Sequence, residues 1–298
     1  MFEDIRKNKI KTGIIVFFFL LLLTLIVYYV CVAFNLGSFS IIIALIFSII
    51  TTYVSYYNCD KVVLASCRAR PATKEENQKL VNILDSLVIS AGLDTKPKLY
   101  IVEDAQPNAF ATGRNPEHSV ICVTTGLLEK LDYYELEGVV AHELGHIKNY
   151  DIRLSAVVSV MVGFIVMLAD WLTRSSLYRH LDDDDDSKVG GFMALIGLIF
   201  LVLSPIVAQL MQLAVSRRRE FLADATSVEL TRNPQGLISA LQKLEEDSNQ
   251  LRTASSSTAH MFISDPFKKN AKGKKKKSSL FSTHPSTEAR IEAIKNIQ

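Results

Sequence analysis

Two long runs without any charged residue most constrain what this chain can fold into. They cover residues 13–34 and 38–57, which are 22 and 20 residues long. A helix needs about 20 apolar residues to cross the hydrocarbon core of a bilayer, so each run is long enough to span it. Only three residues, 35–37, separate them. We therefore expect a tight hairpin of two transmembrane helices. It should be a retained anchor, because the first run is too long for a signal peptide and no small-x-small cleavage site follows.

Two further apolar runs, at residues 154–172 and 189–215, are weaker candidates for membrane spans. The first includes Ser155 and Ser159, and the second includes Gln209. Polar residues at one end of a long apolar helix indicate that this end packs against protein. Buried core helices of a soluble domain are the alternative interpretation. The strongly polar loop between the runs and the lack of a charged stripe favour spanning, so about four transmembrane helices are expected.

The distribution of basic residues predicts the orientation in the membrane. Four basic residues precede the first run, none lies in the link at 35–37, and three follow the fourth run, at 217–219. The loop between the third and fourth runs also carries basic residues beside its acidic tract at 182–186, which weakens the count. Because cytoplasmic loops are enriched in Lys and Arg, both termini and the two large polar segments are expected in the cytoplasm.

Composition excludes some classes of protein. The formal net charge of the 298 residues is only +2, which gives no case for nucleic-acid binding. The four cysteines form neither a CxxC pair nor a dense disulfide framework, and we interpret all four as reduced packing residues. They are Cys31, Cys59, Cys67 and Cys122.

The polar segments predict an α+β fold that is mostly α-helical, with a small β-sheet. Residues 73–91 have helical spacing of apolar residues, and 98–102 and 119–124 are short β-rich runs separated by a loop rich in Gly, Asn and Pro. Asp132, with Glu135 three residues later, indicates a capping box that opens a second helix.

Four units follow from this pattern, with boundaries at the apolar runs. Residues 1–58 form the first membrane hairpin and 59–153 a cytoplasmic α/β segment. Residues 154–215 form the second membrane pair, and 216–298 a second cytoplasmic segment whose stretches 217–231 and 234–246 read as helices. Residues 247–279, rich in Ser, Thr, Asn and Lys, are expected to be mobile. Their basic tract at 274–277 either contacts anionic lipid headgroups or is a solvated loop.

The sequence His142-Glu143-Leu144-Gly145-His146 lies in the middle of the helix that Asp132 opens. Residues i and i+4 share one face of a helix, so both imidazoles can bind the same metal ion, and zinc suits such ligands. Glu143 is then placed to take a proton from the attacking water. Incidental histidines on a surface helix are the alternative, but the flanking residues are small or apolar, as in a packed helix.

A catalytic zinc site needs a third protein ligand and an open position. The best candidate is Glu220, which follows the fourth apolar run just as His146 precedes the third. By spacing alone, Glu220 is one of several acidic options and a surface ion pair is the simpler interpretation. Asp224, one turn later, is placed to hydrogen-bond a ligand histidine.

The segment HELGHIKNYD, followed by an apolar stretch and then RRREFLADA, closely resembles the HtpX-type membrane metallopeptidases, which are relatives of the CAAX prenyl endopeptidases. The resemblance covers nearly the whole chain. It implies a gluzincin-like peptidase domain in which His142, His146 and Glu220 bind one zinc ion and Glu143 is the general base. It further implies quality control of damaged or misfolded membrane proteins in the bacterial cell membrane.

Two more stretches fit this resemblance. Asn108, Ala109 and Phe110 resemble the family's Asn-Ala-Phe motif at a sheet edge, where an extended substrate would pair as an added strand. Without the family this stretch reads as a plain loop. His284, with Arg290 beyond it, resembles a C-terminal motif that returns to the cleft, where the histidine would donate to the developing oxyanion. A surface histidine is the alternative. The other three histidines, His118, His180 and His260, have no supporting context.

The predicted function is hydrolysis of peptide bonds in membrane proteins at the cytoplasmic face. A proteolytically inactive membrane scaffold with a structural zinc site is the first alternative, and the presence of Glu143 argues against it, because a structural site needs only ligands. A transporter or channel is the second, and the scarcity of ionisable residues within the apolar runs argues against it. The natural substrates and the oligomeric state stay open at this level.

Overall fold

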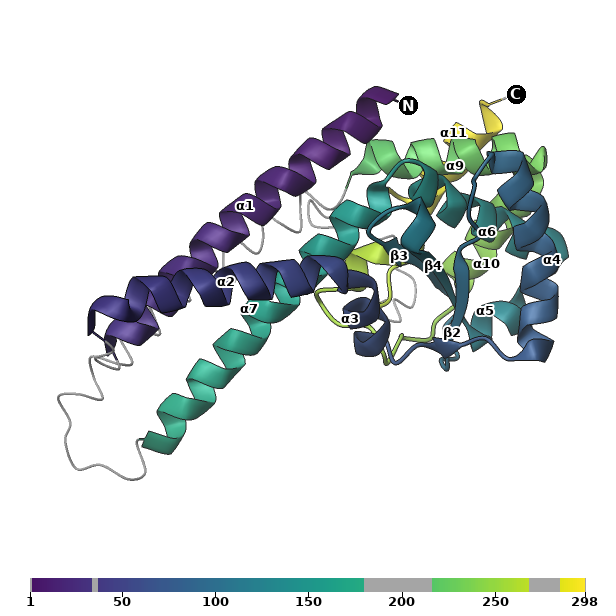
Figure 1. The fold of residues 1–298 in the computed structure, drawn as a ribbon. Coiled ribbons are helices and arrows are strands. Elements are labelled where there is room, and N and C mark those ends of the chain that lie inside the picture. The colour runs from purple at the N-terminus through teal and green to yellow at the C-terminus, as the bar shows by residue number, and fades with distance from the viewer. Residues whose placement is uncertain (1, 34–36, 180–215, 268–284, 298) are drawn as a thin grey trace.

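The computed structural model describes residues 2–33, 37–179, 216–267 and 285–297 (Figure 1). In this part of the chain the fold is mostly helical with one small sheet, as predicted. The helices are α1 (Phe2–Ala33), α2 (Ser40–Tyr57), α3 (Cys59–Ser66), α4 (Lys74–Ala91), α5 (Thr125–Lys130), α6 (Tyr133–Lys148), α7 (Asp151–Arg179), α9 (Arg217–Thr231), α10 (Pro234–Glu246) and α11 (Thr287–Lys295). Short 3-10 turns lie at η1 (Gly37–Phe39), η2 (Pro116–His118) and η3 (Ala259–Met261).

Two of the described helices are long and apolar enough to cross a membrane, over Ile5–Tyr29 in α1 and Gly37–Tyr57 in α2. A third candidate arises only if α6 and α7, which meet at an angle of 83°, are counted as one broken span. The predicted third run at 154–172 lies within α7, and the predicted fourth run at 189–215 lies outside the described residues. The protein is therefore a membrane protein with two to three candidate spans in its described part.

Helices α1, α2 and α7 extend together away from the remainder of the fold (Figure 1). One face of α1, including Phe19 and Leu23, is buried against the apolar face of α7, including Val158 and Met161. The opposite face of α1 is apolar and exposed, and Phe17 is 60% exposed there. An exposed apolar surface of this extent suits contact with lipid.

A mixed four-stranded sheet lies in the α/β part, in the order β1-β2-β4-β3. Its strands are β1 (Arg70–Pro71), β2 (Lys98–Val102), β3 (Ala109–Gly113) and β4 (Ser119–Thr124). Strand β4 pairs in parallel with β2 and antiparallel with β3, which leaves β3 at one edge. Whereas the resemblance implied a sheet edge at residues 108–110, composition alone gave a plain loop here, which was wrong for β3. Its short, mostly small side chains gave no clear β pattern, but all five residues are buried and pair with β4.

The helix boundaries follow the capping signals in the sequence. Thr73 accepts from the backbone N–H of Glu76 to start α4, and Gly92, with φ of 64°, ends it in the left-handed conformation that favours glycine. Asp132 and Glu135 form the predicted capping box of α6, with hydrogen bonds of 2.9 and 3.0 Å. The four cysteines are free and buried, as expected.

Residues 247–267 pack against the sheet, which differs from the mobile segment expected at 247–279. Phe262 is completely buried, and its ring lies edge-on to that of Phe110 with 4.9 Å between centroids. Leu251 and Ile263 are each 3% exposed. Polar composition predicted mobility, but these few apolar side chains fill a space beside the sheet, and burial of that area stabilises the segment. The basic tract at 274–277 lies outside the described residues.

Candidate metal centre

The two histidines of α6 and the glutamate of α9 meet inside the protein. His142 Nε2 lies 3.9 Å from one carboxylate oxygen of Glu220, and His146 Nε2 lies 3.5 Å from the other. All three ligand atoms lie within 4.8 Å of one another, and the three residues form a candidate metal site. Glu220 was one of several acidic options by sequence spacing, and the fold brings it to this position.

Small residues let α6 and α9 approach closely enough for this meeting. A Cβ on Gly145, between the two histidines, would lie 3.2 Å from both Ala223 Cα and Thr226 Cβ. About two turns earlier on α6, the carbonyl oxygen of Gly138 accepts a hydrogen bond of 2.7 Å from Ser227 Oγ. The backbones of the two helices are therefore fixed against each other, and so are the side chains they carry.

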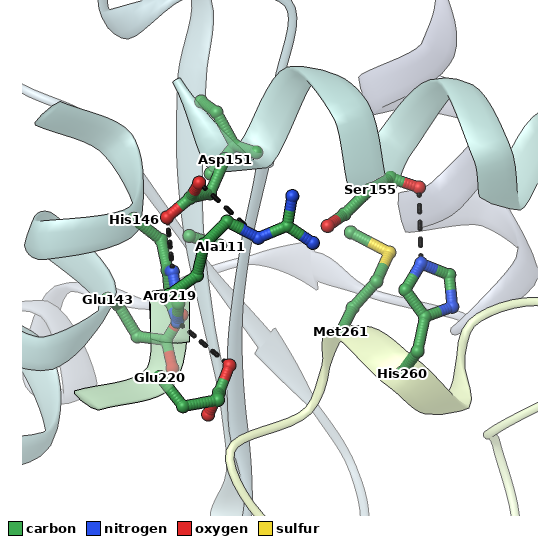
Figure 2. A pocket seen from close by; sticks show the side chains of 10 residues that line it. Ala111, Glu143, His146, Asp151, Ser155, Arg219, Glu220, His260 and Met261 are labelled. Carbon is green, nitrogen blue, oxygen red and sulfur yellow. Dashed lines mark hydrogen bonds and ion pairs between the residues drawn. The ribbon is translucent and has the colours of Figure 1, made fainter. Parts of the chain in front are cut away.

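The donor set and the surroundings fit a divalent metal ion. Two imidazoles and one carboxylate, all from different turns of rigid helices, are the ligands of many catalytic zinc sites. Glu143 Oε2 is buried and has no hydrogen-bond partner within the described residues. Glu143 lines a small cavity together with His146, Glu220 and Ala111 (Figure 2). An unpartnered carboxylate oxygen beside three potential ligands indicates space for a polar reactant such as water.

Asp224 and Arg290 lie beside His142. The Nδ1 atom of His142 lies 2.9 Å from Asp224 Oδ1, so the other ring nitrogen, Nε2, is directed to the metal position. Arg290, from α11, donates to both oxygens of Asp224 at 2.9 and 2.6 Å and is 2% exposed. The position of Asp224 agrees with its predicted role, which the structure leaves as a proposal. The importance of Arg290 was not evident from sequence, where it was only part of a motif.

Asp151 has the corresponding position beside His146. Its Oδ2 lies 3.0 Å from His146 Nδ1, and Figure 2 shows this contact together with the one between His146 and Glu220. Sequence reasoning missed Asp151. The available signal in the sequence was its place at the end of HELGHIKNYD; in the structure Asp151 begins α7, directly after a sharp bend at Tyr150, whose φ is 59°.

Burial and neighbouring charges shift the pKa values of His142, His146 and Glu143 in different directions. Burial lowers the pKa of His142 to about 4, which keeps its imidazole neutral, as a metal ligand must be. Burial would also lower the pKa of His146, but the hydrogen bond to Asp151 and the charge of Glu220 raise it to about 9. Burial raises the pKa of Glu143 to about 7, and Glu220 adds to the rise.

The residues predicted to bind substrate do not lie at an open sheet edge, because residues of the same chain already contact them. Asn108 is completely buried, and its amide donates to the carbonyl oxygen of Ser264 at 2.9 Å. The carbonyl oxygen of Ala109 accepts from the N–H of Ile263 at 3.0 Å. The chain's own segment thus occupies the edge of β3 at these positions, so the prediction that a substrate strand pairs at Asn108, Ala109 and Phe110 needs correction. Ala111, further along β3, lines the cavity instead.

The remaining histidines have different positions. His284 and His180 lie outside the described residues. His118 is exposed and contacts Asn115. His260, which had no supporting context in the sequence, is 6% exposed and lines the cavity, with Nε2 3.4 Å from the carbonyl oxygen of Ser155 (Figure 2). It was missed because its segment was expected to be mobile.

Comparison with known proteins agrees with the site. The model of peptidase family M48 matches residues 74–298. A "Protease HtpX homolog" of Dictyoglomus thermophilum is 43% identical over 294 residues, covering 99% of this chain and 94% of the relative. A "Protease HtpX homolog" of Streptococcus gordonii is 41% identical over 304 residues and is covered completely, as is this chain.

Among solved structures, S. mikatae Ste24p aligns with a TM-score of 0.49 and 18% identity, covering 95% of this chain and 62% of that one. The family match and the two relatives extend over far more than the metal centre. The chain therefore belongs to peptidase family M48, among the HtpX homologs, and is a membrane metallopeptidase.

Proposed function

We propose that this protein is a zinc endopeptidase that hydrolyses peptide bonds of damaged or misfolded membrane proteins at the cytoplasmic face of the bacterial cell membrane. The observation that carries this proposal is the cluster of buried His142 and Glu220 with half-buried His146, beside the unpartnered carboxylate oxygen of Glu143. A structural metal site would need ligands alone, and usually four of them from the protein. The additional buried carboxylate favours catalysis.

Each residue of the site has its own proposed role in the reaction. His142, His146 and Glu220 would hold one zinc ion per chain, which would supply Lewis acidity to activate water and polarise the scissile carbonyl. Glu143 accepts a proton from the attacking water as its oxygen bonds to the carbonyl carbon. When the C–N bond breaks, Glu143 returns this proton to the leaving amine. Asp224 orients His142 throughout, and His284 is proposed to donate to the oxyanion.

The position of α1 supports a site at the membrane surface. Asn8, near the N-terminal end of the candidate span Ile5–Tyr29, donates to Asp151 beside the metal ligand His146. The site therefore lies level with the N-terminal end of this helix. Lys7, Lys9 and Lys11 gather at the same end, and such residues favour the cytoplasmic side. A site at this level would be within reach of segments of membrane proteins.

The experiment compares wild type with Glu143→Gln, purified in detergent. Cleavage of casein and of a destabilised membrane protein is followed with added zinc and with a chelator, while bound metal is quantified. Cleavage by wild type alone, with metal in both proteins, is expected. Metal in both proteins but cleavage by neither would favour an inactive scaffold. Cleavage of casein with no preference for the destabilised over the native membrane protein would contradict the proposed substrate class.

A further inference from the structure

The N-terminal helix α1 reaches the metal centre through one side chain. Asn8 is 5% exposed, and its Nδ2 donates to Asp151 Oδ1 at 2.7 Å and to the carbonyl oxygen of Asn149 at 3.2 Å. Both hydrogens of the amide are thereby used at the corner where α6 ends and α7 begins. The amide oxygen of Asn8 lies 3.5 Å from Nη1 of Arg219, which agrees with this orientation of the amide.

The two carboxylate oxygens of Asp151 have different partners, one on α1 and the other the predicted metal ligand His146. Oδ2 faces His146 Nδ1 at 3.0 Å, and Oδ1 accepts from Asn8. Arg219 Nε lies 3.6 Å from the same Oδ1, a longer and weaker contact. Asp151 is 3% exposed, so bulk water has little access to replace a lost partner. The amide of Asn8 therefore restricts rotation of the carboxylate that orients His146.

We propose that Asn8 is a positioning residue for the metal ligand His146, acting through Asp151, so that docking of α1 on the corner between α6 and α7 sets the affinity for the metal. This inference rests on the proposed function, because it requires His146 to be a ligand. Partners that orient ligating histidines commonly change metal affinity by 10- to 100-fold when they are removed. The candidate membrane helix is then part of the metal site as well as an anchor.

The test measures zinc affinity of the full-length protein in detergent, by competition with a chromophoric chelator. Asn8→Leu and the isosteric Asn8→Asp both remove the donor, and both should weaken zinc binding about 10- to 100-fold. Thr12→Val is the matched control. Thr12 is on the same helix, is 3% exposed, and donates only to the carbonyl oxygen of Asn8 at 2.8 Å, so its variant should bind zinc as wild type does.

Two further readouts separate positioning from general loss of structure. The absorption bands of the cobalt-substituted protein, which depend on ligand geometry, should shift in both Asn8 variants and not in Thr12→Val. In an Asp151→Ala background, Asn8→Leu should have no further effect, because the link to His146 is already absent. Wild-type affinity and cobalt spectrum in either folded Asn8 variant would overturn the inference. If wild type itself binds no metal, the proposed function fails instead.

Discussion

Arg290 is a buried residue whose loss should have a large effect on stability. Its guanidinium forms a two-point ion pair with Asp224, and its Nη1 also donates to the carbonyl oxygen of Ile263 at 3.2 Å. The side chains of the pair are 2% and 1% exposed. Arg290→Met keeps most of the volume but leaves the carboxylate of Asp224 buried without this cation. Breaking a buried ion pair from one side costs about 3–5 kcal/mol.

This free energy corresponds to a large change in melting temperature. In a folded unit of roughly 150–250 residues, each kcal/mol lowers Tm by about 2–4 °C, so Arg290→Met should melt about 6–20 °C below wild type. Because all four cysteines are free and buried, a thiol-reactive fluorophore reports unfolding of the protein in detergent.

Arg70→Met is the matched control for this measurement. Arg70 pairs with Glu76 and Glu103, but its side chain is 36% exposed, and exposed pairs contribute only about 0–1 kcal/mol. Its Tm should fall by no more than about 4 °C. A Tm for Arg290→Met as high as that of Arg70→Met would refute the reasoning from burial.

Three other predictions concern the ion pair between Arg70 and Glu76, the contact between α6 and α9, and the segment that contains Phe262. The pKa of Glu76 is lowered from 4.5 to about 2, chiefly by its hydrogen bond to Arg70, so Glu76→Gln should lose about 1 kcal/mol at pH 7. This difference from wild type should disappear as the pH falls from about 4.5 to about 2, measured by denaturant unfolding; a constant difference would contradict the assignment. Gly145→Ala should displace α9 by a few tenths of an ångström and weaken zinc binding on the order of tenfold, measured by chelator competition; unchanged affinity would show that the helix contact does not position Glu220. Phe262→Ala should cost about 3–5 kcal/mol by the thiol assay, and no change in Tm would restore the view that its segment is mobile.

Local signals in the sequence predicted the elements that carry the ligands. The capping box at Asp132 and the four-residue spacing of His142 and His146 act within one helix, so they need no knowledge of the tertiary fold. The same holds for α4, between Thr73 and Gly92. Boundaries of such elements can be predicted because the residues that determine them are near one another in the chain.

Contacts between distant segments could not be predicted in this way. The link from Asn8 to Asp151 joins residues 143 positions apart and depends on the left-handed backbone of Tyr150 at the bend. The burial of Phe262 against Phe110 depends on an irregular segment without apolar periodicity, so its polar composition gave a wrong prediction of mobility. The composition of residues 109–113 did not predict strand β3 for a related reason, since only its pairing with β4 defines the strand.

The zinc content per chain, measured in the metal-loaded protein after removal of free zinc, tests the central claim most directly. Wild type and Glu143→Gln should each retain about one zinc ion, because Glu143 is the base and not a ligand. Glu220→Leu should retain almost none, whereas Glu229→Gln, an exposed glutamate on the same helix, should match wild type. Full zinc content with unchanged affinity in Glu220→Leu would contradict the assignment of His142, His146 and Glu220 as the metal ligands.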